Sequence, residues 1–210
     1  MARPRLAEID TATTERILVA AEERFAAAGF EAARLEDVAA DAGVTRPSLL
    51  YHFESKDGLY AAVVRRVFAG LGEAMVRAMA TEGSFQERLD RTVRDYVTFL
   101  LEHPSLARIF VRELLDGRGP GRTLLEDEVA PLVAMAEKFL HDGADSSGLA
   151  RGDERGALLL VIGGAVLYAI AGDLRGVFHP AKPAAVTAEI QRLVRAMVPA
   201  GAETKRKGKR

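Results

Sequence analysis

The chain has 210 residues, and 29 Lys and Arg stand against 30 Asp and Glu, a net charge of −1. A hydrophobic share of 49% with 28% charged residues is ordinary for a globular protein and excludes a wholly disordered chain. The absence of cysteine excludes disulfides, thiolate metal sites and a cysteine nucleophile.

The hydropathy of the chain predicts no membrane or secretory segment. Residues 1–10 carry charges and no apolar stretch, so no signal peptide is expected. The longest apolar run, residues 157–172, is shorter than the about 20 residues that a membrane-spanning helix needs. A soluble, cytoplasmic protein without membrane contact is therefore expected.

The charges are unevenly distributed. Residues 201–210 hold five basic residues and one acidic residue, and the remaining 24 basic and 29 acidic residues give a net charge of −5. Residues 1–11 are expected to be a flexible arm and residues 201–210 a disordered basic tail. If the chain binds nucleic acid, the basic residues that do so must be placed locally.

Apolar residues recur at helical spacing along nearly the whole chain, and no stretch alternates as a strand would. The predicted fold class is therefore all-α. Nine helices are expected, in chain order over residues 13–28, 35–42, 46–52, 56–80, 84–103, 104–116, 123–141, 153–174 and 183–198.

Several residues predict where these helices begin and end. Gly29 is expected to stop the first helix. Ser84 with Glu87, and Thr123 with Glu126, have the capping-box spacing that opens a helix. Pro131 is expected to kink the seventh helix. Two stretches, residues 117–121 and 142–152, are expected to be loops because they are rich in Gly, Pro, Ser or Asp.

Short helices with tight turns precede residue 60 and long helices follow it. We therefore expect a small N-terminal module over residues 12–72 and a helical bundle over residues 73–200. The helix over residues 56–80 is expected to be the one element that both modules share, so any coupling between them would pass through it.

Residues 34–53 predict a helix, a tight turn and a second helix. Gly43 provides the positive φ that a sharp turn requires, and Thr45 is a good cap for the second helix. Leu49 and Phe53, four residues apart, form the inner stripe of that helix. The opposite side carries Arg46, Pro47, Leu50 and Tyr51.

That outer face combines a hydrogen-bonding cation with apolar groups. The major groove of DNA presents guanine acceptors and thymine methyls, and its width admits a helix. On periodicity alone, the alternative is that these are ordinary surface residues of a helical bundle.

The run from Leu35 to Leu59, which includes GVTRPSLLYHFESKDGL, resembles the DNA-binding domain of TetR-family transcriptional regulators. The resemblance extends over about residues 12–70 and takes in Phe25, Gly29 and Phe30. Beyond it, the chain is similar to the family only in architecture, which implies a helical ligand-binding and dimerisation domain.

The resemblance implies a role for each matching position. Arg46, Pro47 and Tyr51 would face base edges, and Phe53 would be core. The residues that would contact phosphates are Thr45, Ser48, His52 and Lys56.

Two positions depart from the family's commoner pattern. Arg34 stands where Thr or Ser usually caps the preceding helix, so that helix loses a side-chain cap worth about 1 kcal/mol, while Arg34 could reach a phosphate. Leu50 replaces a frequent Tyr and is expected to pack on a thymine methyl or a sugar.

The C-terminal half predicts a dimer and an effector site. Gly163 and Gly164 inside an apolar helix favour close approach of a partner helix, so residues 153–174 and 183–198 are the expected homodimer interface. The candidate residues for binding an apolar or aromatic effector are Tyr96, Phe99, Phe110, Met135, Phe139 and Tyr168. Residues of these types at helical spacing more often form plain core than a pocket wall.

The sequence therefore predicts a ligand-responsive regulator, a repressor by family default. It would bind palindromic operator DNA as a dimer and release it when a small molecule binds. No cofactor, metal site or catalytic residue is expected, because the four histidines are scattered and no metalloprotease, phosphate-loop or serine-hydrolase motif is present. The alternatives are a helical-bundle enzyme and a DNA-binding protein without ligand control.

Overall fold

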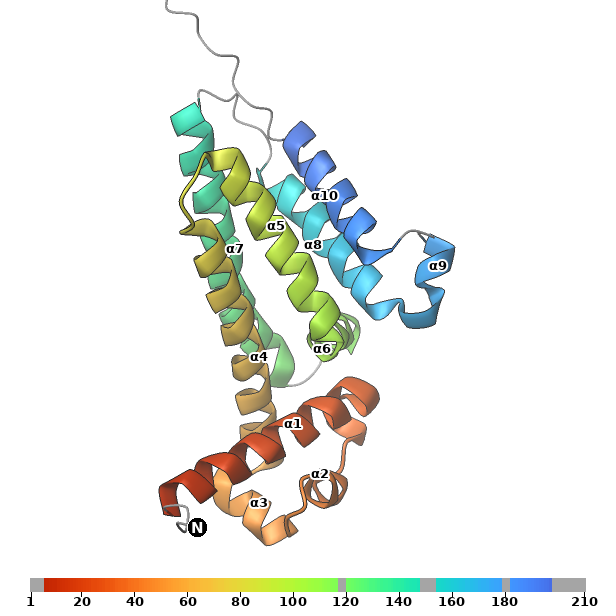
Figure 1. Ribbon diagram of the computed structural model, residues 1–210. Coiled ribbons are helices and arrows are strands. Elements are labelled where there is room, and N and C mark those ends of the chain that lie inside the picture. The colour runs from red at the N-terminus through yellow and green to blue at the C-terminus, as the bar shows by residue number, and fades with distance from the viewer. Residues whose placement is uncertain (1–5, 117–119, 148–153, 179–181, 198–210) are drawn as a thin grey trace, which may run out of the picture. The chain divides into compact units, whose positions relative to one another are not determined.

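The computed structural model describes residues 6–116, 120–147, 154–178 and 182–197, all shown in Figure 1. Over these ranges the chain is helical and contains no strand, as the sequence predicts. The elements are, in chain order, α1 (Leu6–Ala32), α2 (Leu35–Asp41), α3 (Arg46–Phe53), α4 (Lys56–Met79), α5 (Phe85–Glu102), α6 (Pro104–Asp116), α7 (Pro120–Ser147), α8 (Glu154–Ile170), the 3₁₀ turn η1 (Gly172–Leu174), α9 (Arg175–Phe178) and α10 (Pro183–Met197).

The first six helices follow the predicted order, and the predicted ends hold with one exception at the N-terminus. α1 begins at Leu6, several residues before the expected start. Gly29 leaves helical geometry with φ 81°, as predicted, and a short helical segment continues to Ala32 beyond it. A side chain at this φ would be strained, which is why glycine ends the long part of α1.

The predicted ends of the seventh helix are wrong. α7 begins at Pro120, because proline suits a first helical turn, so Thr123 lies inside the helix and caps nothing. It continues past Asp142 to Ser147, so the first part of the expected loop over 142–152 is helical. α7 also remains one helix across Pro131, where we expected a kink.

The last helices differ in one detail. The expected helix over 153–174 ends at Ile170, and η1 and the four-residue α9 follow it, so there are ten α-helices rather than nine in the described ranges. Residues 6–11 of the expected flexible arm are helical, so that expectation is wrong for them. Residues 1–5 and the expected basic tail over 201–210 lie outside the described residues.

The chain divides into two compact units. The first comprises residues 1–70 and 103–130, and the second comprises residues 71–102 and 131–210. The division falls inside α4 and inside α7, so the expectation that α4 alone belongs to both modules is wrong. The chain passes from one unit to the other at three points. Two lie after Gly70 within α4 and before Pro131 within α7, and the third lies between α5 and α6, where Pro104 follows.

In the first unit, α1 packs against α2 and α6. Ile17 and Phe25 of α1 are buried, as the predicted inner stripe requires. The Arg112 guanidinium of α6 donates to the backbone carbonyls of Ala26, at 3.1 Å, and Ala27, at 2.6 Å. This arginine therefore ties α6 to the last turn of α1 before the break at Gly29.

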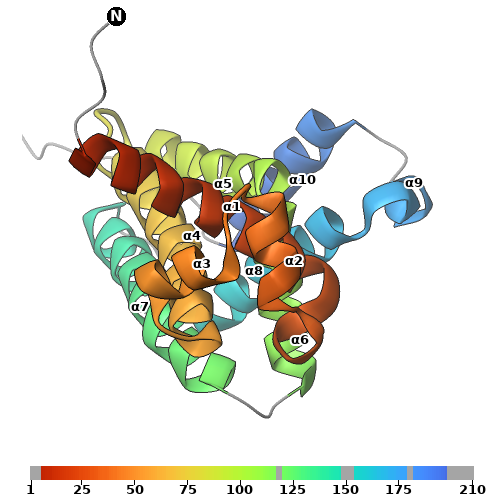
Figure 2. The same cartoon turned by 90° about the horizontal axis from the view of Figure 1, so that it is seen from below.

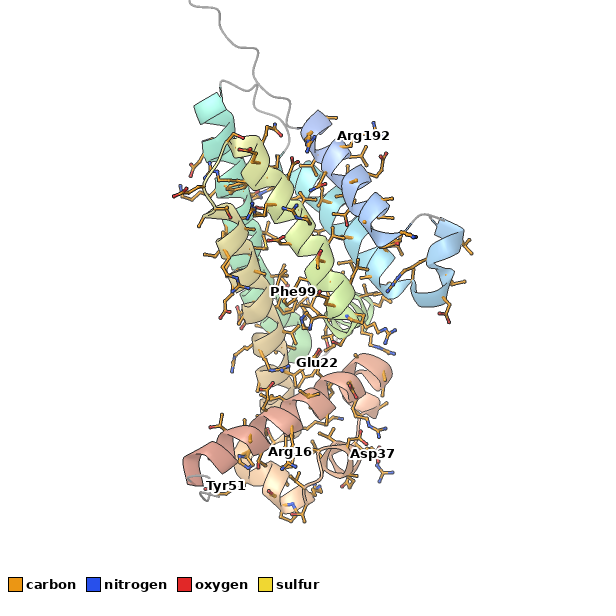
Figure 3. The ribbon with its side chains drawn as sticks, in the orientation of Figure 1. Arg16, Glu22, Asp37, Tyr51, Phe99 and Arg192 are labelled. Carbon is orange, nitrogen blue, oxygen red and sulfur yellow. The ribbon has the colours of Figure 1, made fainter. Side chains whose placement is uncertain are left out.

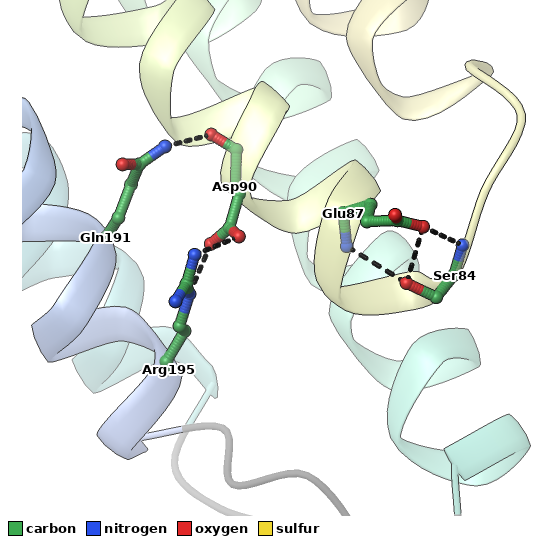
Figure 4. A network of polar contacts seen from close by, with 5 residues as sticks. All are labelled: Ser84, Glu87, Asp90, Gln191 and Arg195. Carbon is green, nitrogen blue, oxygen red and sulfur yellow. Dashed lines mark hydrogen bonds and ion pairs between the residues drawn. The ribbon is translucent and has the colours of Figure 1, made fainter.

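In the second unit, α5, α8 and α10 lie side by side (Figure 1). Asp90 of α5 links α5 to α10, because its carboxylate accepts from Arg195 at 2.7 Å and its carbonyl accepts from Gln191 at 2.6 Å (Figure 4). Apolar residues at helical spacing on α5 are buried: Phe85, Leu89, Val93, Val97 and Leu100. Within the described residues, no helix has the length and apolar character needed to cross a membrane.

The first predicted capping box is present at the start of α5 (Figure 4). The backbone N–H of Ser84 donates to the Glu87 carboxylate at 2.8 Å, and the backbone N–H of Glu87 donates to the Ser84 hydroxyl at 3.3 Å. The hydrogen bonds from the Ser84 backbone and hydroxyl hold the pKa of Glu87 below its usual value of 4.5.

Replacing Ser84 by Ala is predicted to lower the free energy of unfolding at pH 7 by about 1 kcal/mol, because the cap is lost. The lowered pKa of Glu87 means that its ionised form stabilises the fold above pH 4.5. This contribution disappears as the pH falls through the lower folded value. Urea unfolding should therefore show a difference between wild type and Ser84→Ala that shrinks in acid, whereas Ser84→Thr, which keeps the hydroxyl, should stay close to wild type. A difference that grows in acid would contradict this assignment.

Candidate nucleic-acid interface

α2 and α3 form a helix-turn-helix beside α1 (Figure 2). Gly43 adopts φ 66° in the turn, as predicted, and the backbone N–H of Val44 donates to the carbonyl of Ala39 at 2.9 Å. The Thr45 hydroxyl caps α3 by accepting from the backbone N–H of Ser48 at 3.3 Å. These local bonds fix where α3 begins and the direction in which it leaves the turn.

One side chain fixes the rotation of α3 about its own axis. Leu49 is fully buried, and Val38 of α2 is buried as well, so this side of α3 faces the core. Phe53, expected to be core, is only half-buried, because it lies in the last turn of the short helix. The inner stripe of α3 therefore rests mainly on Leu49.

The residues on the opposite side of α3 are exposed. Arg46 and Pro47 are exposed at the start of the helix, and Tyr51 is 81% exposed, the largest value among the exposed large hydrophobic residues (Figure 3). Ser48 and Leu50 are half-buried beside them. Arg46, Pro47 and Tyr51, which are predicted to face bases, thus lie on one outward surface. They give that surface a cation, an apolar ring and an aromatic hydroxyl.

Two of the residues expected to contact phosphates make contacts to α1 instead of lying free. His52 Nδ1 is 3.2 Å from the Thr14 hydroxyl and 3.4 Å from the Asp10 carboxylate. Lys56 donates to the backbone carbonyl of Glu31 at 2.9 Å, and its ammonium lies over the Phe30 ring. Both side chains therefore tie the helix-turn-helix to α1.

Arg34 is exposed, and its side chain makes no capping hydrogen bond to α2, as the sequence predicts. Arg46 is ion-paired with Glu36 in the first turn of α2, with Arg46 Nε and Glu36 Oε1 3.1 Å apart. Sequence reasoning missed Glu36, because the pair joins two helices across the turn and no linear spacing indicates it.

The six candidate effector residues do not all belong to one unit. Phe110 lies in the first unit, and the other five lie on α5, α7 and α8 of the second. Tyr96 and Tyr168 are buried, whereas Phe99, Met135 and Phe139 are half-buried. Burial raises the pKa of the Tyr96 hydroxyl, which therefore stays protonated at neutral pH. Figure 3 labels Phe99 on α5.

No group of three or more His, Cys, Asp or Glu that could hold a metal is found in the part of the chain that the structure describes.

Comparison with known proteins places the helix-turn-helix in a family. Residues 17–63 match the sequence model described as "Bacterial regulatory proteins, tetR family". Residues 17–63 thus resemble the DNA-binding domain of TetR-family regulators. The chain is 33% identical to the HTH-type transcriptional regulator RutR of Escherichia coli K12 over 119 residues, which is 57% of this chain and 54% of RutR. It is 37% identical to the transcriptional activator FasR of Mycolicibacterium smegmatis over 90 residues, 43% of this chain and 41% of FasR. The chain thus matches about half the length of these curated relatives.

Solved structures extend the likeness in fold to most of the chain. A tetR-family regulatory protein from Rhodococcus RHA1 superposes with a TM-score of 0.73 at 22% identity, covering 90% of this chain and 98% of that one. The regulator FadR of Bacillus subtilis, solved in complex with stearoyl-CoA, gives a TM-score of 0.71 at 18% identity and covers 86% of this chain and 96% of its own. At these identities the likeness shows a TetR-type fold.

Leu49 is buried and Tyr51 is exposed, so substitutions at these two positions test the orientation of α3 directly. Leu49→Ala is predicted to lower the free energy of unfolding by about 2–5 kcal/mol, because it leaves a cavity under the turn. Tyr51→Ala should change it by less than about 0.5 kcal/mol, because the ring lies in solvent. Chemical unfolding of both variants measures this, and a large loss for Tyr51→Ala would mean that the ring packs inside the protein.

Proposed function

We propose that this protein is a transcriptional regulator that binds palindromic operator DNA as a homodimer through α3 and is released from it by a small-molecule effector. One observation carries the proposal: a TetR-type helix-turn-helix turns Arg46, Pro47 and Tyr51 of α3 outward. The named relatives RutR and FasR are transcriptional regulators, which favours a regulator over an enzyme.

The outward face of α3 has the chemistry to read base edges. The Arg46 guanidinium can donate two hydrogen bonds to O6 and N7 of a guanine. Leu50 and Pro47 supply apolar surface for a thymine methyl or a sugar, and the Tyr51 hydroxyl adds a hydrogen-bonding group. Contacts to phosphates are assigned to Arg34, Thr45, Ser48, His52 and Lys56.

Because the net charge of the chain is −1, we expect its affinity for DNA to depend on few contacts. Each neutralised phosphate contributes about 0.9 to the slope of log affinity against log salt concentration. The salt dependence should therefore be modest and binding to unrelated sequences weak.

The exposed apolar face of α8 supports a homodimer. Leu160 and Leu167 of α8 are 66% and 50% exposed, and nothing lies within 4 Å of a Cβ built at Gly163 or Gly164. These residues follow helical spacing along one side of the helix. α10 packs beside α8 and adds Leu193, 49% exposed. A second copy would cover this apolar surface and approach closely at the glycines.

A two-fold dimer presents two copies of α3 related by symmetry. Such a pair fits a palindrome whose half-sites are separated by whole helical turns. We propose repression as the outcome of binding, although the named relatives include the activator FasR as well as the repressor BepR of Brucella suis.

We further propose that an apolar or aromatic effector binds within the second unit. The side chains that would contact it are Tyr96, Phe99, Met135, Phe139 and Tyr168. Stearoyl-CoA is a suitable first probe because FadR, a protein with the same fold, was solved with it. The effector would favour a dimer whose α3 helices no longer match successive major grooves. A ligand that binds tightly and leaves operator affinity unchanged would contradict this coupling.

The DNA-reading residues are tested on a duplex selected by the wild-type protein from a randomised library. Arg46→Ala and Tyr51→Ala should each weaken binding to that duplex by about 5- to 150-fold. Binding to a scrambled duplex of the same composition should change much less, because these side chains read bases. Fluorescence anisotropy measures both, with Arg77→Ala on the exposed surface of α4 as the control. Equal losses on the two duplexes would contradict base readout.

The dimer is tested by a charge on its proposed interface. Leu160→Glu should convert the protein to a monomer, because a carboxylate would be buried without a partner. Leu115→Glu on α6, where the native leucine is 79% exposed, is the matched control and should leave the dimer intact. Size-exclusion chromatography with light scattering gives the mass of each. A Leu160→Glu protein that stays dimeric would place the interface elsewhere.

A further inference from the structure

The ion pair between α2 and α3 involves a residue of the proposed DNA-reading face. Arg46 is the first residue of α3, and Glu36 is the second residue of α2. Their side chains are 53% and 56% exposed, and Arg46 Nε lies 3.1 Å from Glu36 Oε1. Among the described residues on the outward face of α3, Arg46 alone makes a salt bridge. The guanidinium proposed to recognise guanine is therefore already paired with a carboxylate.

We infer that Glu36 holds the Arg46 guanidinium in the free protein and lowers the affinity for DNA until a guanine replaces it. This inference rests on the proposed function, because it assigns a second residue to the same DNA-reading surface. Glu36 is a positioning residue here: it acts through Arg46 and need not touch DNA.

The strengths of the competing contacts support this role. An exposed ion pair shifts an equilibrium by about 1.4- to 5-fold. A bidentate contact between arginine and guanine discriminates by about 5- to 150-fold. A guanine at the right position therefore displaces Glu36, and the cost of breaking the ion pair is subtracted in full from the affinity for that site. A phosphate offers an exposed ionic contact of comparable strength, so it displaces Glu36 only in part, and binding to unrelated DNA loses no more than binding to the cognate site does.

The neighbouring residue provides a matched control. Asp37, labelled in Figure 3, follows Glu36 in the same first turn of α2 and is exposed. The salt bridge of Arg46 is to Glu36 and not to Asp37. Glu36→Gln and Asp37→Asn remove the same charge from adjacent positions. Both substitutions should strengthen DNA binding, because they reduce the repulsion between the protein and the DNA phosphates. Only Glu36→Gln frees Arg46.

The experiment measures affinities of the full-length protein for two duplexes, the one that the wild type selects from a randomised library and a scrambled version of it. Relative to Asp37→Asn, Glu36→Gln should tighten binding to the selected duplex by about 1.4- to fivefold, the strength of the exposed ion pair. On the scrambled duplex, the gain should be no larger than on the selected one. The salt slope on the scrambled duplex should rise by about 0.9 for each α3 engaged. In an Arg46→Ala background, Glu36→Gln and Asp37→Asn should become equivalent.

Three outcomes would overturn the inference. If Glu36→Gln and Asp37→Asn match on both duplexes, Glu36 contributes only its charge. If Glu36→Gln changes the preferred base at one position of the selected site, Glu36 reads that base directly and does not act through Arg46. If the wild type selects no sequence at all, the proposed function fails and the inference fails with it, a result distinct from the first two.

Discussion

The burial of Leu49 beneath the turn at Gly43 is the constraint on which the proposed function depends. A helix of eight residues has little stability of its own, so its orientation must come from tertiary packing. Because Leu49 is fully buried, the residues on the opposite side of α3 point outward. The Thr45 cap fixes the start of the helix at the turn. The outward position of Arg46 and Tyr51 is thus a consequence of one buried side chain and one cap.

The parts of the fold set by local chemistry were predictable from the sequence. The turn at Gly43, the cap at Thr45 and the capping box at Ser84 each depend on residues within a few positions of one another. The second capping-box pattern, at Thr123, failed because Pro120 opened the helix earlier and the pattern then fell inside it. A local signal therefore predicts correctly only where no stronger signal lies a turn away.

The parts set by contacts between distant residues were not predictable. Nothing in the spacing of α6 indicates that Arg112 donates to carbonyls of α1, 85 residues or more earlier in the chain, or that residues 103–130 join the N-terminal unit. The same limit applies to the candidate interface. The exposed face of α3 follows from helical periodicity, but the Glu36 partner of Arg46 and the contact of His52 with Thr14 arise only when helices pack.

Methylation protection by dimethyl sulfate tests the contact between α3 and the major groove most directly, because the reagent attacks N7 of guanine in that groove. On a duplex bound by the protein, we expect protected guanines in two equivalent half-sites on one side of the DNA. Full reactivity of every guanine N7 in a bound duplex, or protection in one half-site only, would contradict it.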